Sequence, residues 1–183
     1  MKRMLRGLLA VGCLFPISLA LAAMAAHADS VLQFDGGIGV DPLTPAGGVD
    51  QLNVVRGVNP GGRAWAIREL NAKIYSGGSA VVRGEGLLFS SGDVIATRGP
   101  VGQVVATLAC GEANSTATKY TTESAPLSEA GDFTIRGTLR GIDGNVAPLE
   151  TVPCDNPLLL IRAAGVAGAG GWLAVGILDR DKQ

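Results

Sequence analysis

"GRAWAIRELNAKIYSGGSAVVRGEGLLFSSGD", residues 62–93, contains two runs in which apolar and polar side chains alternate, with Ser-Gly-Gly between them. Alternation with a period of two is the pattern of a half-buried β-strand. The glycines at positions 77 and 78 supply the positive-φ conformations that a tight reversal needs. The segment therefore predicts a β-hairpin that covers one wall of a core.

The apolar residues of this segment also predict where the first strand is irregular. Trp65 and Ile67 belong to the opposite phase from the apolar residues that follow them, Leu70, Ala72 and Ile74. A one-residue bulge near Arg68–Glu69 would bring all five onto the core side. In the second strand the alternation turns Arg83 and Glu85 outward and turns four residues inward, namely Val82, Gly84, Gly86 and Leu88.

The rest of the chain repeats this style of short apolar stretches separated by Gly, Pro, Asn and Asp. Such a pattern is typical of an all-β sandwich or barrel. The strands we expect are 30–34, 51–57, 64–75, 79–90, 101–110, 118–122, 131–141, 157–164 and 171–179. Eight or nine short antiparallel strands are enough for two packed sheets, so the predicted fold is an immunoglobulin-like two-sheet β-sandwich.

The N-terminus has the pattern of a secretory signal peptide. Lys2, Arg3 and Arg6 precede an apolar run that ends in Ala-His-Ala before Asp29. A basic region, an apolar core and a small-x-small site predict cleavage after Ala28. This leaves a single domain, residues 29–183, exported to the periplasm or the medium. Lipidation of Cys13 is a less favoured alternative, because the apolar run before it is short.

Removal of the leader changes which chemistry is open to the protein. His27 is the only histidine, so the mature chain has none, which closes the Ser-His-Asp and Cys-His routes of nucleophilic catalysis. Removal of the leader also leaves more acidic than basic residues and no basic run, which argues against nucleic acid as a partner. Catalysis by a pair of carboxylates stays open, although Glu69 and Glu85 have basic neighbours that explain them as surface ion pairs.

The two cysteines outside the leader are Cys110 and Cys154. In an exported protein they predict one disulfide. The enclosed loop would restrict the unfolded chain by about 4 kcal/mol on the loop-entropy model.

Three residues are candidates for ligand contact. Trp65 would offer a platform for a sugar if it were exposed, but a core anchor is the favoured interpretation. Asp143 and Asn145, in "GIDGNV", have oxygen atoms that calcium prefers, yet they are also ordinary turn residues without EF-hand spacing. No cofactor or metal is expected, and "GGIG" at 36–39 is not followed by a helix that would bind phosphate.

An apolar residue, Arg and Gly recur together four times, with the arginines at positions 56, 83, 136 and 140. The spacing has no constant period, so this is not a structural repeat. Outward arginines on solvated strands are the favoured explanation. The alternative is a row of arginines that binds carboxylate or sulfate groups.

The C-terminal segment 157–178 is apolar, but Arg162 and five glycines interrupt it. A charge at mid-membrane is costly, so two buried strands are favoured over a membrane anchor.

Several segments together resemble a group of exported bacterial β-domain proteins: "VVRGVNPGGRAWAI", "GEGLLF", "ATLAC", "GDFTIRG", "NPLLLIR" and "GWLAVG". The resemblance implies one secreted β-domain with one disulfide and implies no activity, cofactor or site residue. The function we expect is a non-catalytic binding or structural module of the cell envelope, with a glycan or a protein as partner. The alternatives are a carboxylate-dependent enzyme acting on envelope glycans and a module that pairs with itself or a partner through an edge strand.

Overall fold

The computed structural model describes residues 30–46, 49–165 and 168–182, and the predicted leader, Cys13 and His27 lie outside them. In these described ranges, thirteen β-strands and one 3₁₀ turn make up the regular structure, so the all-β prediction is confirmed. The strands are β1 (Ser30–Gly39), β2 (Leu43–Ala46), β3 (Val49–Leu52), β4 (Trp65–Ala66), β5 (Glu69–Tyr75), β6 (Ser79–Glu85), β7 (Leu88–Phe89), β8 (Gln103–Cys110), β9 (Thr118–Thr121), β10 (Ala125–Pro126), β11 (Phe133–Thr138), β12 (Leu158–Gly165) and β13 (Gly168–Leu178). The turn η1 (Arg180–Lys182) follows the last strand.

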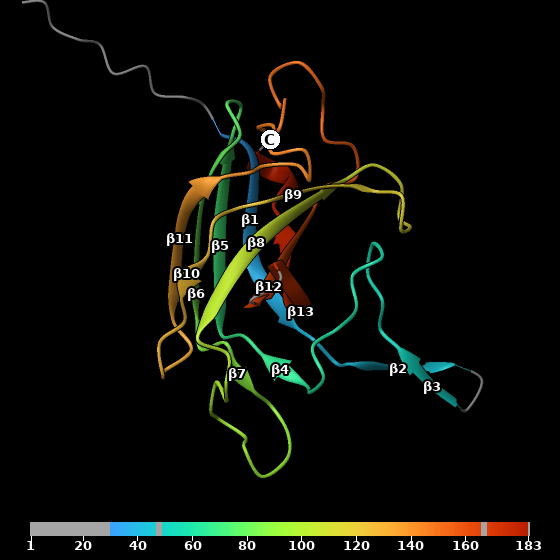
Figure 1. Ribbon diagram of the computed structural model, residues 1–183, viewed down its shortest axis with the longest axis vertical. Helices are drawn as coiled ribbons and strands as arrows, with labels where there is room; N and C mark the ends of the chain where they lie inside the picture. Colours follow the sequence, from blue (N-terminus) through green and yellow to red (C-terminus); the bar gives the residue numbers. More distant parts are fainter. Residues whose placement is uncertain (1–29, 47–48, 166–167, 183) are drawn as a thin grey trace, which may run out of the picture.

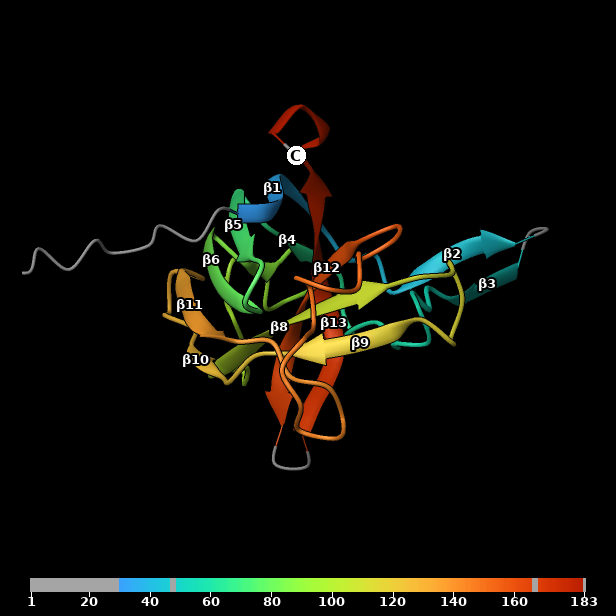
Figure 2. The ribbon, with the colours of Figure 1, turned by 90° about the horizontal axis from the view of Figure 1, so that it is seen from above.

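Nine of the strands form one antiparallel sheet in the order β10-β8-β12-β13-β1-β5-β6-β11, with β9 also paired to β8. The sheet curls until its two ends approach each other, which gives a barrel-like body (Figures 1 and 2). The two packed sheets of an immunoglobulin-like sandwich are therefore not confirmed. Alternation along a strand reports which residues face inward, but it does not report whether the sheet divides or closes.

The two ends of the sheet meet at a short seam. Thr121, at the end of β9, exchanges backbone hydrogen bonds of 2.8 and 3.0 Å with Arg140, just beyond β11. Beside this bridge, the Glu123 carboxylate accepts the backbone N–H of Thr138 at 3.0 Å. The side chain thus occupies a position where a further strand residue would otherwise pair.

Side chains fill the interior of the barrel-like body. Fully buried residues come from every side of the sheet and include Phe34, Leu70, Ile74, Leu108, Ile135, Leu159 and Ile161. Glycines make room for the aromatic rings, since a Cβ at Gly84 would lie 2.3 Å from the Phe133 ring. The interior is therefore a packed core of apolar side chains.

The hairpin predicted from residues 62–93 is present as β5 and β6, in register from Glu69–Glu85 to Ile74–Ala80. Its first strand is interrupted at residues 67–68, and this break lets Trp65 lie in the core together with Leu70. One detail was wrong. Gly86 has a φ of +65° and ends β6, so the phase changes there and Leu87 is buried completely while Leu88 is only half-buried.

Two predicted boundaries near the N-terminus are also wrong. The first strand continues through the glycine-rich stretch to Gly39, with a bulge between Phe34 and Gly37. The strand expected at 51–57 is divided, because residues 49–52 belong to the separate β2–β3 hairpin. Residues 53–62 instead cross the outside of the body, and Pro60 pairs with Trp172 of β13. The β2–β3 hairpin projects away from the body (Figure 2).

The predicted disulfide between Cys110 and Cys154 is present and links the end of β8 to the segment before β12, with 4.9 Å between the two Cα atoms. Within the segment 157–178, residues 158–165 and 168–178 form β12 and β13 rather than a long apolar helix. In the described ranges there is no helix of the length and apolar character that a bilayer crossing requires.

Candidate functional site

The candidate site is a solvent-open hollow of about 470 Å³ on the outer wall of the sheet, across β1, β5, β6 and β11. The strand registers arrange its side chains in two rows. One row runs Gln33, Lys73, Val81 and Arg136, and the next runs Asp35, Asn71 and Arg83, with Thr134 continuing it on β11 outside the lining. Alternation places these residues on the face opposite the core, so they form a polar wall over an apolar interior.

The basic half of the hollow lies on β5, β6 and β11. Lys73 and Arg136 flank the half-buried Val81 in one row, and Arg83 lies two residues farther along β6. All three cationic residues are exposed. Within the part of the chain that the structure describes, none of their side chains forms a hydrogen bond or an ion pair with another residue. Their charges are therefore directed to solvent.

The acidic half of the hollow lies on β1 and just after β13. Asp35 and Asp179 line it, and the backbone N–H of Asp179 donates to the Gln33 carbonyl at 2.9 Å, which fixes the chain end against β1. Two aromatic residues are among the lining residues: Tyr75, which is half-buried, and Phe34, which belongs to the core. The hollow thus has cations on one side and carboxylates on the other.

The four Arg-Gly motifs divide into two groups in the structure. Arg83 and Arg136 both line the hollow, as the anion-binding alternative requires. Arg56 instead donates to the carbonyl oxygens of Gly111, Glu112 and Asn156, and thereby ties residues 53–62 to both sides of the disulfide. Arg140 donates to the Gly144 carbonyl and lies near Glu123.

The three ligand-contact candidates from the sequence lie away from this hollow. Trp65 is only 4% exposed, and its ring packs against Phe89 with 4.4 Å between centroids, which favours a core anchor. The Asp143 carboxylate accepts the backbone and side-chain N–H groups of Asn145, and these hydrogen bonds lower the pKa of Asp143. Across the described ranges, no group of three His, Cys, Asp or Glu residues is placed to hold a metal ion.

A second hollow, of about 540 Å³, lies on the other side of the body against β8, β12 and β13. Its lining includes no ionisable side chain. The hydroxyl groups in it are already engaged: Ser124 donates to Gln103, and Thr122 donates to the Glu123 carbonyl. It therefore offers little to orient a polar ligand.

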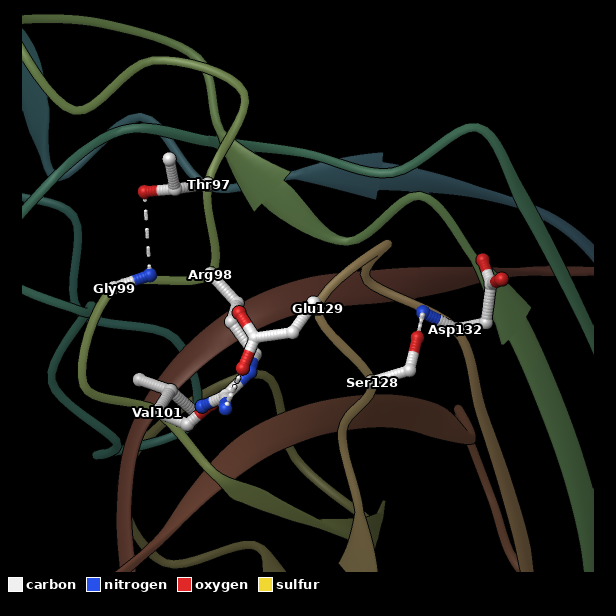
Figure 3. Close-up of polar contacts among 7 residues, drawn as sticks. All are labelled: Thr97, Arg98, Gly99, Val101, Ser128, Glu129 and Asp132. Atoms are coloured by element: carbon white, nitrogen blue, oxygen red, sulfur yellow. Dashed lines mark hydrogen bonds and ion pairs between the residues drawn. The ribbon is translucent and has the colours of Figure 1, made fainter.

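A polar cluster between the 91–102 loop and the turn before β11 also contains charged groups (Figure 3). The Arg98 guanidinium points toward the Glu129 carboxylate, with which it pairs, and also donates to the Val101 carbonyl at 2.8 Å. Asp132 points away from this pair and accepts the backbone N–H of Gly86 at 3.0 Å. These contacts join two loops, and we interpret the cluster as structural.

Reasoning from the sequence did not assign Lys73, Asp179 or Tyr75 to a site, and it considered Asp35 only as a weak candidate for calcium. The outward phase of Lys73 was readable from the alternation in β5. Its proximity to Arg136 depends on the registers β5–β6 and β6–β11, which bring together residues 63 positions apart. No local signal in the sequence reports that pairing.

Comparison of the chain with protein-family models, with curated proteins and with solved structures gives no match. The resemblance to exported bacterial β-domains gains no support from these comparisons.

Proposed function

We propose that the protein is an exported, non-catalytic binding module that takes its ligand on the outer wall of the sheet. The observation that carries this proposal is the hollow lined by Lys73, Arg83 and Arg136, three exposed cations whose side chains have no partner among the described residues. A packed interior supports it further, because side chains occupy the space that ligand-carrying barrels leave open.

Export is supported by the leader pattern of residues 1–28 and by the disulfide, which is typical of proteins in oxidising compartments. Fusion of residues 1–28 to a reporter that is active only outside the cytoplasm tests this part. We expect an active reporter and an N-terminus at Asp29 in the processed protein. Retention of an uncleaved leader in the cytoplasm would contradict it.

The preference for binding over catalysis rests on the electrostatics of the carboxyl groups. A general acid needs a carboxyl whose pKa is raised toward neutrality. Among the described carboxyl groups, Glu123 and Asp143 show a clear shift, and both have a lowered pKa because backbone N–H groups donate to them. Lowered values keep these groups ionised, which does not suit proton donation to a leaving group.

A second candidate, pairing with another copy, is favoured by one observation. Leu43 and Leu52 are opposite each other on the projecting β2–β3 hairpin and are 42% and 59% exposed. An isolated two-stranded hairpin is marginally stable in water, so a covering partner would stabilise it. Sedimentation of the protein and of an L43S/L52S variant tests this: a dimer that the variant abolishes would support self-pairing, and a monomer at all concentrations would exclude it.

The binding proposal is tested by capture of envelope components on the immobilised protein. We expect a specific component to be retained by the wild-type protein and lost in a variant with Lys73, Arg83 and Arg136 changed to Gln. Retention that is unaffected by these three changes would show that the ligand binds elsewhere.

A further inference from the structure

We propose that the hollow across β1, β5, β6 and β11 binds an acidic glycan, with Arg83 and Arg136 holding the carboxylate or sulfate group of one sugar residue. This inference rests on the proposed binding function and names its ligand class. It is carried by the positions of the charged side chains on the four strands.

The cations surround a small apolar floor. Val81 is half-buried between Lys73 on β5 and Arg136 on β11, which are its direct cross-strand neighbours. Arg83 lies two residues along β6 on the same face and is diagonal to Arg136. Diagonal neighbours on one face of a sheet are about 7–8 Å apart, which long side chains bridge easily. The two guanidinium groups can therefore reach a single oxyanion above Val81.

Arginine suits this role because its planar fork matches the geometry of carboxylate and sulfate oxygens. Neither Arg83 nor Arg136 is held by a carboxylate in the described part of the chain, so a ligand has no internal ion pair to displace. Lys73 adds a third positive charge on the opposite side of Val81. An anion bound here would lie among three cations from three neighbouring strands.

The opposite half of the hollow favours a hydroxylated molecule over a simple anion. Asp35 and Asn71 face each other across β1 and β5 and offer hydrogen-bond acceptors. Sugar hydroxyl groups donate to such acceptors, and the Tyr75 ring offers an apolar surface nearby. A sugar acid carries an anionic group and hydroxyl groups on one ring, which corresponds to the division of charge between the two halves.

The hollow is open to solvent and is not enclosed, so it is suited to one segment of a polymer. The carboxylates of Asp35 and Asp179 disfavour an anionic group near them, so the anionic group of the ligand would bind on the β6–β11 side of the hollow. A polyphosphate backbone that extends across the whole hollow would meet these carboxylates, and the formal net charge of the full chain, −1, gives it no general attraction.

The test is titration of the purified protein with polygalacturonate as the carboxylated glycan, dextran sulfate as the sulfated one, and dextran as the neutral one. We expect binding to one or both acidic glycans, no binding to dextran, and weakening with added salt. The variant R83Q/R136Q should lose at least about tenfold in affinity, since two charged hydrogen-bonded contacts are removed. The control R63Q/R180Q removes two exposed arginines outside the hollow and should bind as the wild type does.

Equal loss of affinity in both double variants would overturn the inference, because binding would then depend on net charge alone. So would binding of dextran equal to that of the acidic glycans, or binding of a single-stranded oligonucleotide that exceeds both. If R83Q/R136Q still captures an envelope component that the wild type captures, the ligand class is wrong while the proposed binding function survives. If the wild type captures nothing and binds no glycan, both fail.

Discussion

Thr121 and Arg140 exchange both of their backbone hydrogen bonds, at 2.8 and 3.0 Å, and this pair joins the two ends of the curled sheet. Next to this pair, the contact across the seam is made by the side chain of Glu123 and not by the backbone of a further strand residue. Glu123 accepts the backbone N–H of Thr138 across the seam, while the Thr122 hydroxyl accepts that of Ala106 in β8 and extends the β8–β9 pairing. The closure of the body therefore depends on polar contacts over a few residues.

Glu123→Gln tests the contribution of this seam. The pKa of Glu123 is lowered because its own backbone N–H and that of Thr138 donate to the carboxylate. A lowered folded-state pKa stabilises the protein above the ordinary carboxyl pKa, and this stabilisation is lost as the pH falls through the folded-state value. We expect the variant to be less stable at about pH 7 by at most ~1 kcal/mol, because the side chain is 61% exposed.

The measurement is urea unfolding of both proteins at about pH 7 and about pH 3, on either side of the ordinary carboxyl pKa. The difference in unfolding free energy should shrink at the lower pH. A difference that grows as the pH falls would contradict the assigned direction of the pKa shift.

Gly84→Ala tests the packed interior. A Cβ at this position would lie 2.3 Å from the Phe133 ring, across the β6–β11 pair. Overpacking of this kind costs about 1–3 kcal/mol. Thermal unfolding should show the loss, and the double variant G84A/F133L should recover part of it by removing the ring. If G84A alone were as stable as the wild type, the interior would have to contain more free space than we describe.

Arg56→Ala tests the contacts that hold residues 53–62 over the outside of the body. The guanidinium donates to three carbonyl oxygens on either side of the disulfide, and the backbone of Arg56 has a φ of +51°. Loss of these donors should cost about 1–2 kcal/mol in unfolding free energy. Arg56→Lys should recover only part, since an ammonium group lacks the fork that spans separated acceptors.

Limited proteolysis provides the local readout for Arg56. The alanine variant should be cut faster within residues 53–62 or 111–117 than the wild type, with the same cleavage pattern elsewhere. Unchanged rates in both segments would mean that Arg56 does not hold them.

Removal of the disulfide in the variant C110S/C154S tests the clamp between the end of β8 and the segment before β12. The cysteines are 44 positions apart in the chain. The loop-entropy model gives a loss of about 4 kcal/mol, which we treat as an upper value. Urea unfolding should give the same unfolding free energy for the reduced wild type and for the variant. The oxidised wild type should give a higher value.

Sequence patterns predicted the local features of this protein well, because alternation, turn glycines and cysteine pairing are local or leave few choices. The β5–β6 hairpin and the Cys110–Cys154 bond follow from such signals. The closure of the sheet does not follow from local signals, because it depends on the pairing of Thr121, at the end of β9, with Arg140, just beyond β11. Gly36 and Gly37, which resemble loop residues, lie within β1 since the bulge there accommodates them.

The hollow shows the same division between local and non-local information. Outward phases of Lys73 and Arg83 are visible in the sequence, and the Arg-Gly motifs allow an anion-binding row of arginines as an alternative. Their convergence with Arg136 and Asp35 depends on three strand registers. Arg56 carries the same Arg-Gly motif yet binds backbone carbonyls, and the motif alone cannot separate these roles.

Both tryptophans of the protein lie beside Gly61 in the 53–62 segment. A Cβ on this glycine would be 3.3 Å from the Trp65 indole nitrogen and 3.4 Å from the Trp172 carbonyl oxygen. The Trp172 indole in turn donates to the Asn53 carbonyl at 2.9 Å. Intrinsic fluorescence therefore monitors a single region: detachment of this segment should shift the emission to the red, whereas occupancy of the distant wall around Tyr75 should leave the spectrum unchanged.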